Sequence, residues 1–223
     1  MTDIIDVKAG VEAENDRKAA EVRKLLRDHH VRMINLMASP GAGKTSLLEQ
    51  TVDRLKDEYR ILVLEADADA DVDAKRIEAH GVRAVQVHTG GSCHMDAAMT
   101  MQALQTLDLD SLDLIFLENV GNLVCPAEFD TGDDLKVMIL SVPEGDDKPL
   151  KYPLMFKVVD CLLINKIDTD MVFDFNLQKF HEYVEPLNRD VHIIPISAFT
   201  GSGIENWLVY LRQKLMAWKK EDA

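Results

Sequence analysis

Cysteine is scarce in this sequence, whose 223 residues include only Cys93, Cys125 and Cys161 and no C-x-x-C pair. Such a sparse, odd set argues against a disulfide scaffold and favours a reducing cytosol. There is no run of about 18 apolar residues, so we expect no transmembrane span. The first residues lack the basic region and apolar core of a signal peptide. We therefore expect a cytoplasmic protein.

Positive charge is also in short supply. Lys and Arg number 25 against 39 Asp and Glu, which gives a net charge of −14. This balance argues against nucleic acid, or an anionic membrane surface, as the main partner. Internal repeats and Gly/Ser linkers are absent, and 47% of the residues are hydrophobic. These features predict one well-filled domain over residues 1–223.

The segment A-S-P-G-A-G-K-T at residues 38–45 follows an apolar run and precedes a helical pattern. Strand, glycine-rich turn and helix form the context of a phosphate-binding loop, although Ala38 replaces its usual first glycine. We expect Lys44 to reach the β- and γ-phosphates and Thr45 to bind Mg²⁺. The predicted nucleotide-binding residues of this loop are Pro40, Gly41, Ala42, Gly43, Lys44, Thr45 and Ser46.

Short apolar runs recur along the chain with helical segments between most of them. They cover residues 33–37, 61–64, 84–88, 114–117, 137–142, 161–164 and 191–196. This pattern predicts an α/β fold, a mostly parallel sheet with helices on both faces, as in the three-layer P-loop NTPases. An amphipathic helix is expected over about 11–30, and a second over 204–218 with Trp207, Leu208, Leu211 and Leu215 in the core.

Asn165-Lys166-Ile167-Asp168 ends one predicted strand and resembles the N-K-x-D base-recognition motif of P-loop GTPases. The Asp168 carboxylate can accept from both N1–H and the exocyclic amine of guanine, a pair of donors that adenine lacks. Lys166 can lay its aliphatic stem over the base. Ser197-Ala198-Phe199, after the strand at 191–196, resembles the second guanine-contacting loop. Together the segments favour GTP and GDP over adenine nucleotides.

The strand at 114–117 ends in Glu118-Asn119-Val120-Gly121. A carboxylate there usually touches the Mg²⁺ shell, and the glycine N–H can sense the γ-phosphate. Glu118, where Ras-like proteins have Asp, resembles the SIMIBI class of P-loop GTPases, which often act as nucleotide-dependent dimers. No glutamine that could position water stands beside Gly121, so we expect slow intrinsic hydrolysis.

Four carboxylates follow the strand at 61–64, namely Asp67, Asp69, Asp71 and Asp73. Not all of them can enter one metal shell. The SIMIBI resemblance favours Asp67 and Asp73 as switch positions, with Asp67 near Mg²⁺ or the attacking water, although spacing alone leaves the choice open. The predicted catalytic residues are Lys44, Asp67, Glu118 and Gly121, and the predicted Mg²⁺ ligands are Thr45 and Asp67.

Cys93, His94 and Cys125 lie in loops that each follow a strand. Two thiolates and an imidazole suit Zn²⁺ or Ni²⁺. From the residues alone, two unrelated cysteines and a surface histidine are the preferred interpretation. Cys161 stands inside an apolar strand and is expected to be a buried, inert thiol.

The segments G-G-S-C-H-M-D-A and E-N-V-G-N-L-V-C-P-A-x-F-D, together with the phosphate loop and N-K-I-D, closely resemble the HypB family of GTPases. That family assists nickel insertion into [NiFe]-hydrogenase, and the resemblance runs from about residue 34 to 218. It implies that Cys93, His94 and Cys125 form a Ni²⁺ or Zn²⁺ site. It also implies a GTP-dependent homodimer, a HypA-like nickel chaperone and the hydrogenase large-subunit precursor as partners.

Some relatives carry an N-terminal C-x-x-C-G-C motif or a long histidine tract, and this chain has neither. Any role in metal binding or transfer must therefore depend on the site in the GTPase domain. One alternative is an accessory GTPase for another nickel enzyme such as urease, although the C-P-H motif of UreG is missing. The other is a nucleotide-gated scaffold with a structural zinc.

An apolar cluster of Met171, Val172, Phe173 and Phe175 follows the N-K-I-D segment. Such a cluster is often a partner surface, and the HypB resemblance places a dimer contact in this region. The alternative is that these side chains fold back on the core.

Overall fold

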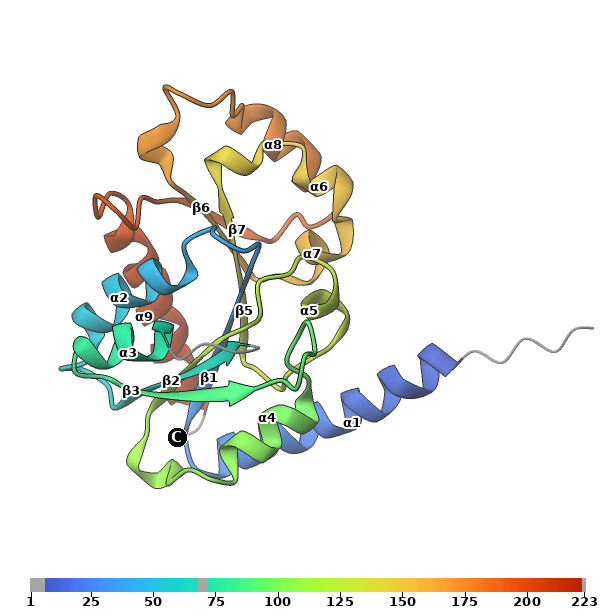
Figure 1. The fold of residues 1–223 in the computed structure, drawn as a ribbon, viewed down its shortest axis with the longest axis vertical. Coiled ribbons are helices and arrows are strands. Elements are labelled where there is room, and N and C mark those ends of the chain that lie inside the picture. Colours follow the sequence, from blue (N-terminus) through green and yellow to red (C-terminus); the bar gives the residue numbers. More distant parts are fainter. Residues whose placement is uncertain (1–6, 68–71, 222–223) are drawn as a thin grey trace, which may run out of the picture.

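A computed structural model describes residues 7–67 and 72–221. Within this part of the chain, one seven-stranded sheet has the strand order β3-β2-β4-β1-β5-β6-β7, and all neighbours are parallel (Figure 1). The strands are β1 (Arg32–Ala38), β2 (Ile61–Asp67), β3 (Arg83–His88), β4 (Leu114–Glu118), β5 (Leu135–Ser141), β6 (Cys161–Asn165) and β7 (His192–Pro195). The predicted α/β fold with a parallel sheet is confirmed.

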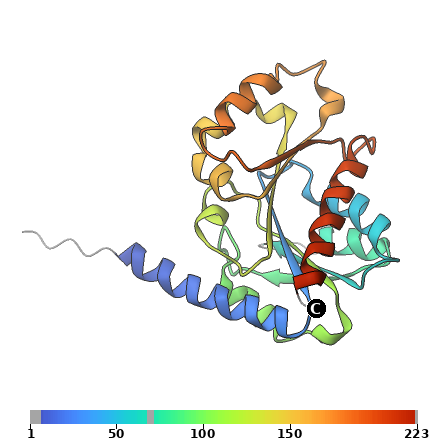
Figure 2. The same cartoon turned by 180° about the vertical axis from the view of Figure 1, so that it is seen from behind.

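Helices cover both faces of this sheet (Figures 1 and 2). They are α1 (Val7–Asp28), α2 (Lys44–Leu55), α3 (Val72–Ala79), α4 (Ala97–Leu104), α5 (Cys125–Glu128), α6 (Lys148–Lys151), α7 (Pro153–Val158), α8 (Leu177–Val184) and α9 (Ile204–Glu221). Residues of α2, α3 and α9 share one apolar cluster with one face of the strands. The opposite face packs against α1 and α4 over one half, and against α7 and α8 over the other.

Alternation along β1 assigns its side chains to these layers. Ile34 and Leu36 point into the cluster with α2 and α9. On the opposite face, Met33 packs with α1 and α4, whereas Met37 packs with α7 and α8. Asn35 lies between them and is fully buried. The second face therefore carries two apolar clusters with a polar residue at their junction.

The long helices agree closely with the expected ranges. The N-terminal helix begins and ends slightly earlier than expected, at Val7 and Asp28, and the C-terminal helix extends to Glu221. The residues expected in the core from α9, Trp207, Leu208, Leu211 and Leu215, are all buried. Strand β5 ends at Ser141, one residue short of the expected run, because Val142 and Pro143 begin a 3-10 turn capped by Ser141 and Glu144. Cys161 is fully buried, as expected.

The apolar cluster after the N-K-I-D segment divides into two parts. Met171 and Val172 are 93% and 78% exposed, and Phe173 is 42% exposed. Phe175 instead packs on the core, with its ring 5.5 Å from that of Phe180. The expectation of one exposed patch is therefore wrong for Phe175, because α8 offers its ring an aromatic partner. None of the helices in the described ranges is both long and apolar enough to cross a bilayer.

Helix α1 packs tightly on the loop between α5 and β5. Gly132 has a φ of 83°, and a Cβ there would lie 2.5 Å from Cβ of Val22 and 2.9 Å from the Ala19 carbonyl oxygen. From the same helix, Asn15 donates to the Asp130 carbonyl oxygen and accepts from the Ala97 N–H. Arg23 forms an ion pair with Asp130 at 2.6 Å. Helix α1 is therefore a closely fitted part of the fold.

We expect Gly132→Ala to lower the free energy of unfolding by about 2–4 kcal/mol, because it combines a left-handed φ with a steric clash against α1. Gly81→Ala is the matched control. Gly81 has a φ of 79°, but a Cβ added there would meet only open space, so its loss should be about 1–2 kcal/mol. Urea unfolding measures both values. Equal losses would contradict the close packing of α1.

Candidate nucleotide and metal sites

The loop between β1 and α2 has the backbone of a phosphate-binding turn. Gly41 and Gly43 have φ angles of 75° and 104°, a region that a side chain would strain. Gly43 also has no room for a side chain, because a Cβ would lie 2.4 Å from Nδ2 of Asn165. Helix α2 starts at Lys44, and its unpaired N–H groups add positive partial charge. The loop can therefore hold an anionic phosphate.

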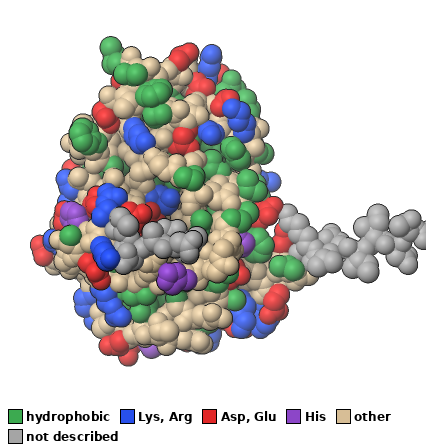
Figure 3. All heavy atoms as spheres, in the orientation of Figure 1, with side chains coloured by type: hydrophobic (Ala, Val, Ile, Leu, Met, Phe, Trp, Pro, Cys, Tyr) green, Lys and Arg blue, Asp and Glu red, His purple; other side chains and the backbone are tan. Residues whose placement is uncertain are grey.

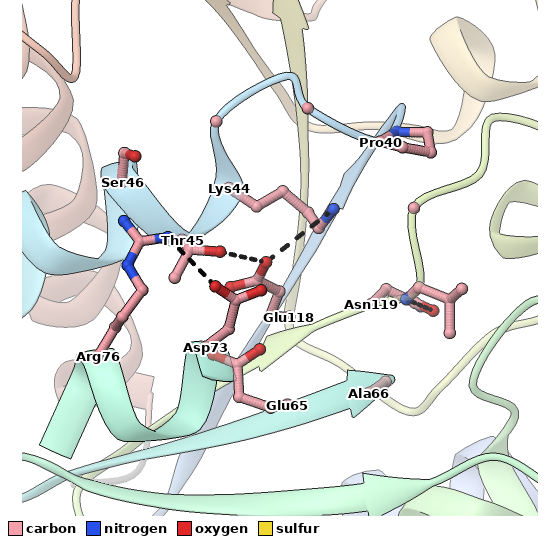
Figure 4. A pocket seen from close by; sticks show the side chains of 14 residues that line it. Pro40, Lys44, Thr45, Ser46, Glu65, Ala66, Asp73, Arg76, Glu118 and Asn119 are labelled. Atoms are coloured by element: carbon pink, nitrogen blue, oxygen red, sulfur yellow. Dashed lines mark hydrogen bonds and ion pairs between the residues drawn. The ribbon is translucent and has the colours of Figure 1, made fainter. Parts of the chain in front are cut away.

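An open pocket of about 550 Å³ lies beside this loop and the carboxyl ends of β2 and β4 (Figure 4). Of the predicted residues, Pro40, Gly41, Gly43, Lys44, Thr45, Ser46, Glu118 and Gly121 line it. Ala42 is instead buried beneath the loop, where its carbonyl oxygen accepts from Asn165. Gly121 lies against the loop, since a Cβ there would be 3.0 Å from Cγ of Pro40.

Glu118 lies at the base of the pocket, below the start of α2 (Figure 4). Its Oε1 accepts a hydrogen bond from the Thr45 hydroxyl at 3.0 Å and lies 4.0 Å from Nζ of Lys44. Thr45, which is expected to bind Mg²⁺, is thus hydrogen-bonded to Glu118, the carboxylate expected near the Mg²⁺ shell.

A second carboxyl group, Glu65 on β2, lies opposite Glu118 in the register of β2 with β4. Both groups are buried. Burial, followed by the negative charge of Glu118, raises the pKa of Glu65 to about 9. Burial also raises the pKa of Glu118, against the opposing effects of Lys44 and Thr45. Burial and mutual repulsion therefore both favour the protonated form within this pair when no cation is present.

This donor set fits Mg²⁺. Oε1 of Glu65 and Oε2 of Glu118 are buried and accept no hydrogen bond from the described residues, which is costly for a polar atom. Together with the Thr45 hydroxyl they provide hard oxygen donors, the kind that Mg²⁺ prefers. The sequence motifs do not include Glu65, although a carboxylate directly after the apolar run Ile61–Leu64 is a detectable signal.

Of the four aspartates at 67, 69, 71 and 73, the structure describes the side chain of Asp73 alone. It lines the pocket from the first turn of α3 and accepts from Nη1 of Arg76 at 3.2 Å. Arg76 also binds Glu49 of α2 through two bonds of 2.9 Å. Asp67 is the last residue of β2, but its side chain lies outside the described part of the structure, as do Asp69 and Asp71. The role of Asp67 stays a prediction.

Asn165 connects the three segments expected to bind the nucleotide. Its Nδ2 donates to the Ala42 carbonyl oxygen and its Oδ1 accepts from the Ala198 N–H, both at 2.9 Å. Lys166, with a left-handed φ of 63°, donates from Nζ to the Gly41 carbonyl oxygen at 2.8 Å. The N-K-x-D segment therefore fixes the phosphate loop and the S-A-F loop in one arrangement.

Asp168 accepts a hydrogen bond from the Ser197 hydroxyl, which orients the carboxylate expected to read guanine. Ser197 and Ala198 are buried, whereas Phe199 is 88% exposed. The Ala198 N–H donates to Oδ1 of Asn165, so this main-chain N–H holds the S-A-F loop in place. The structure brings together all the predicted base-contacting segments.

Cys93, His94 and Cys125 also converge. Their ligating atoms lie within 4.8 Å of one another, and the two sulfurs are 2.9 Å apart as free thiols. The His94 ring stacks on Phe129 at 4.2 Å. Burial lowers the pKa of His94, which favours the neutral imidazole that binds metals. The interpretation of these residues as unrelated is therefore less consistent with the geometry than that of a thiolate–imidazole site for Zn²⁺ or Ni²⁺.

Comparison with known proteins agrees with this geometry. A family model described as "CobW/HypB/UreG, nucleotide-binding domain" matches residues 32–195. The hydrogenase maturation factor HypB of Azotobacter vinelandii is 44% identical over 211 residues, which are 95% of this chain and 70% of that protein. This chain belongs to the HypB family. The resemblance inferred from the sequence motifs is thereby confirmed.

Two further HypB proteins are informative. The crystal structure of HypB from Helicobacter pylori in complex with nickel has a TM-score of 0.86 at 37% identity, over 92% of this chain and 96% of that one. The hydrogenase/urease maturation factor HypB of Helicobacter hepaticus is 41% identical over 214 residues, covering 94% of this chain and 88% of that protein. The HypB fold confirms the predicted P-loop architecture.

We expect Asp168→Asn to weaken GTP binding by about 1.5–3 kcal/mol, because an amide donor would replace the acceptor facing two guanine donors. Asp170→Asn, which makes the same charge change on an exposed neighbour, is the control and should have little effect. Displacement of a fluorescent guanine nucleotide by GTP and by ATP measures both. Equal affinities of the unmutated protein for GTP and ATP would exclude guanine specificity.

Proposed function

We propose that this chain is an Mg²⁺-dependent GTPase that acts as a nickel metallochaperone in the maturation of [NiFe]-hydrogenase. Nickel is its cargo, and GTP is its substrate. Membership of the HypB family and the nickel complex of the Helicobacter pylori relative support this proposal. We further propose that the protein works in the cytoplasm.

One observation carries the proposal. The cluster of Cys93, His94 and Cys125 and the phosphate loop lie at the same edge of the sheet, and Cys125 stands four residues after Gly121 in the chain. Gly121 packs against Pro40 of the loop. A peptide shift that brings the Gly121 N–H onto a γ-phosphate must be absorbed within three residues, so it must move the Cys125 sulfur.

The nucleotide half follows from the residues at the pocket. Lys44 and the loop N–H groups would hold the β- and γ-phosphates, while Thr45, Asp67 and the Glu65–Glu118 pair would hold Mg²⁺. When bound, Mg²⁺ would neutralise part of the negative charge of the phosphates. Intrinsic hydrolysis is slow, because no glutamine beside Gly121 positions the attacking water. GTP and GDP states therefore persist long enough to act as signals.

In this mechanism GTP closes a homodimer and brings metal ligands of two subunits together. Hydrolysis loosens them and releases the metal to a partner, a HypA-like nickel chaperone or the hydrogenase large-subunit precursor. A urease client is the second candidate, supported by the name of the Helicobacter hepaticus relative. The third candidate, a scaffold with structural Zn²⁺, predicts a metal affinity that does not change with the bound nucleotide.

The decisive experiment measures Ni²⁺ and Zn²⁺ affinities in the GDP form and with a non-hydrolysable GTP analogue. We expect the two states to differ by about 5–150-fold, and bound metal must change nucleotide affinity by the same factor. Cys125→Ala should abolish this difference and leave GTP binding nearly unchanged. Cys161→Ala, which removes a thiol in the core, should keep the difference. Identical affinities in the unmutated protein would leave a passive metal site.

The exposed part of the apolar cluster, Met171–Phe173, is proposed as a dimer contact. It lies on the loop between β6 and α8, at the upper end of the view in Figure 3, where apolar side chains reach the surface. We expect Met171→Ala with Phe173→Ala to give monomers in the GTP-analogue state while hydrolysis is largely kept. Sedimentation velocity measures the species present.

Val209 and Met216 provide the matched control for this prediction. They are 51% and 57% exposed on α9, away from the loop. Replacing both by Ala also removes two exposed apolar side chains and should leave the dimer intact. A Met171/Phe173 double variant that still sediments as a dimer would show that this loop is not part of the interface.

A further inference from the structure

Asn119, the residue after Glu118, connects the nucleotide pocket to the segment that carries Cys93 and His94. It lines the pocket (Figure 4), yet it is only 1% exposed. Oδ1 accepts from the Met95 N–H at 3.0 Å and from the Val120 N–H at 2.9 Å. Met95 directly follows His94. One amide oxygen thus holds the main chain beside the metal ligand and the main chain beside Gly121.

The other end of the same amide connects to the core. Nδ2 of Asn119 donates to Oδ1 of Asn35 at 3.2 Å, on the strand that leads into the phosphate loop. Asn35 in turn donates to Oγ1 of Thr131 and Oδ1 of Asp133, both at 3.3 Å. All four residues are buried. Because two N–H donors face Oδ1, the orientation of the Asn119 amide is fixed.

This network reaches both segments that carry metal ligands. Met95 is next to His94, and Thr131 lies two residues beyond Phe129, the ring on which His94 stacks. The segment from Cys125 leads into Thr131 through α5. Both loops are therefore tied, through Asn119 and Asn35, to the strand ends that frame the nucleotide.

We propose that Asn119 is the positioning residue that couples the nucleotide state to the metal site, an inference that rests on the proposed function. A shift of residues 118–121 toward a γ-phosphate carries the Asn119 amide with it. The buried Met95 N–H has to follow its acceptor, because an unpaired buried N–H is costly. His94 and Cys93 then change position relative to Cys125. This route acts on the two ligands that the Gly121–Cys125 connection does not reach.

A spatial network becomes coupling only when both sites bias the same element, and the test measures that directly. The ratio of Ni²⁺ dissociation constants between the GDP and GTP-analogue forms is measured by competition with a chromophoric chelator. We expect Asn119→Ala to bring this ratio to within about 2-fold of one, from the 5–150-fold typical of coupled sites. If Asn119 had a purely structural role, its substitution would change both dissociation constants together and leave their ratio unchanged.

Asn188→Ala is the matched control. Its side-chain amide donates to the carbonyl oxygens of Phe156 and Val159, away from both sites, so this variant loses comparable bonds and should keep the unmutated ratio. Circular dichroism checks that each variant folds. An unmutated ratio in folded Asn119→Ala would overturn the inference and leave the proposed function standing. A ratio of one in the unmutated protein would instead overturn the switching function, and the inference with it.

A second measurement decides the matter if Asn119→Ala does not fold. Amide hydrogen exchange of the unmutated protein is compared between the GDP and GTP-analogue forms, in peptides that contain the Met95 N–H. We expect a difference of at least about 3-fold in exchange rate, because the acceptor of this amide moves with the nucleotide pocket. The same exchange rate in both forms would overturn the inference.

Discussion

Main-chain hydrogen bonding between β1 and β4 continues past the last residue of β4, where the Asn119 N–H donates to the Leu36 carbonyl oxygen at 3.0 Å. In the same register Glu118 lies opposite Leu36, two residues before β1 ends at Ala38. The Thr45 hydroxyl, at the start of the helix that follows, therefore meets the Glu118 carboxylate. Parallel strands end at one edge of a sheet, and the phosphate loop, the carboxylates and the metal-ligand loops all depend on that shared edge.

Electrostatics at this edge have an unusual balance. The phosphate loop suits a polyanion, yet Glu65, Glu118 and Asp73 line the same pocket and the Glu118 carboxylate lies 4.0 Å from Nζ of Lys44. Backbone N–H groups and the N-terminus of α2 add to the attraction of Lys44 for phosphate, while the acidic groups favour a cation beside it. The chain as a whole carries −14. Affinity for a nucleotide is thus a local property of the loop, opposed by the charge of the rest of the molecule.

Much of the fold and of the site could be predicted because the signals are local. The phosphate loop, N-K-I-D and S-A-F each sit at the end of an apolar run, and their convergence follows from parallel topology alone. The contacts that depend on tertiary packing could not be predicted. The pairing of Glu65 with Glu118 and the bonds of Asn119 join residues far apart in sequence. The proximity of Cys93 to Cys125 was implied only by the family resemblance, because nothing in the spacing of the two residues requires it. Phe175 packs on the core because its ring contacts that of Phe180 in α8.

Asn35 divides one face of the sheet into two apolar clusters, one with α1 and α4 and the other with α7 and α8. Free-energy changes at sites that share no partners usually add, whereas those at touching sites do not. The two clusters can therefore accept substitutions independently of each other during divergence. Residues along the polar junction can change only together, since each amide or hydroxyl there satisfies its neighbour. The sequence of this protein is thus free to drift in the two clusters and is tightly constrained along the junction that separates them.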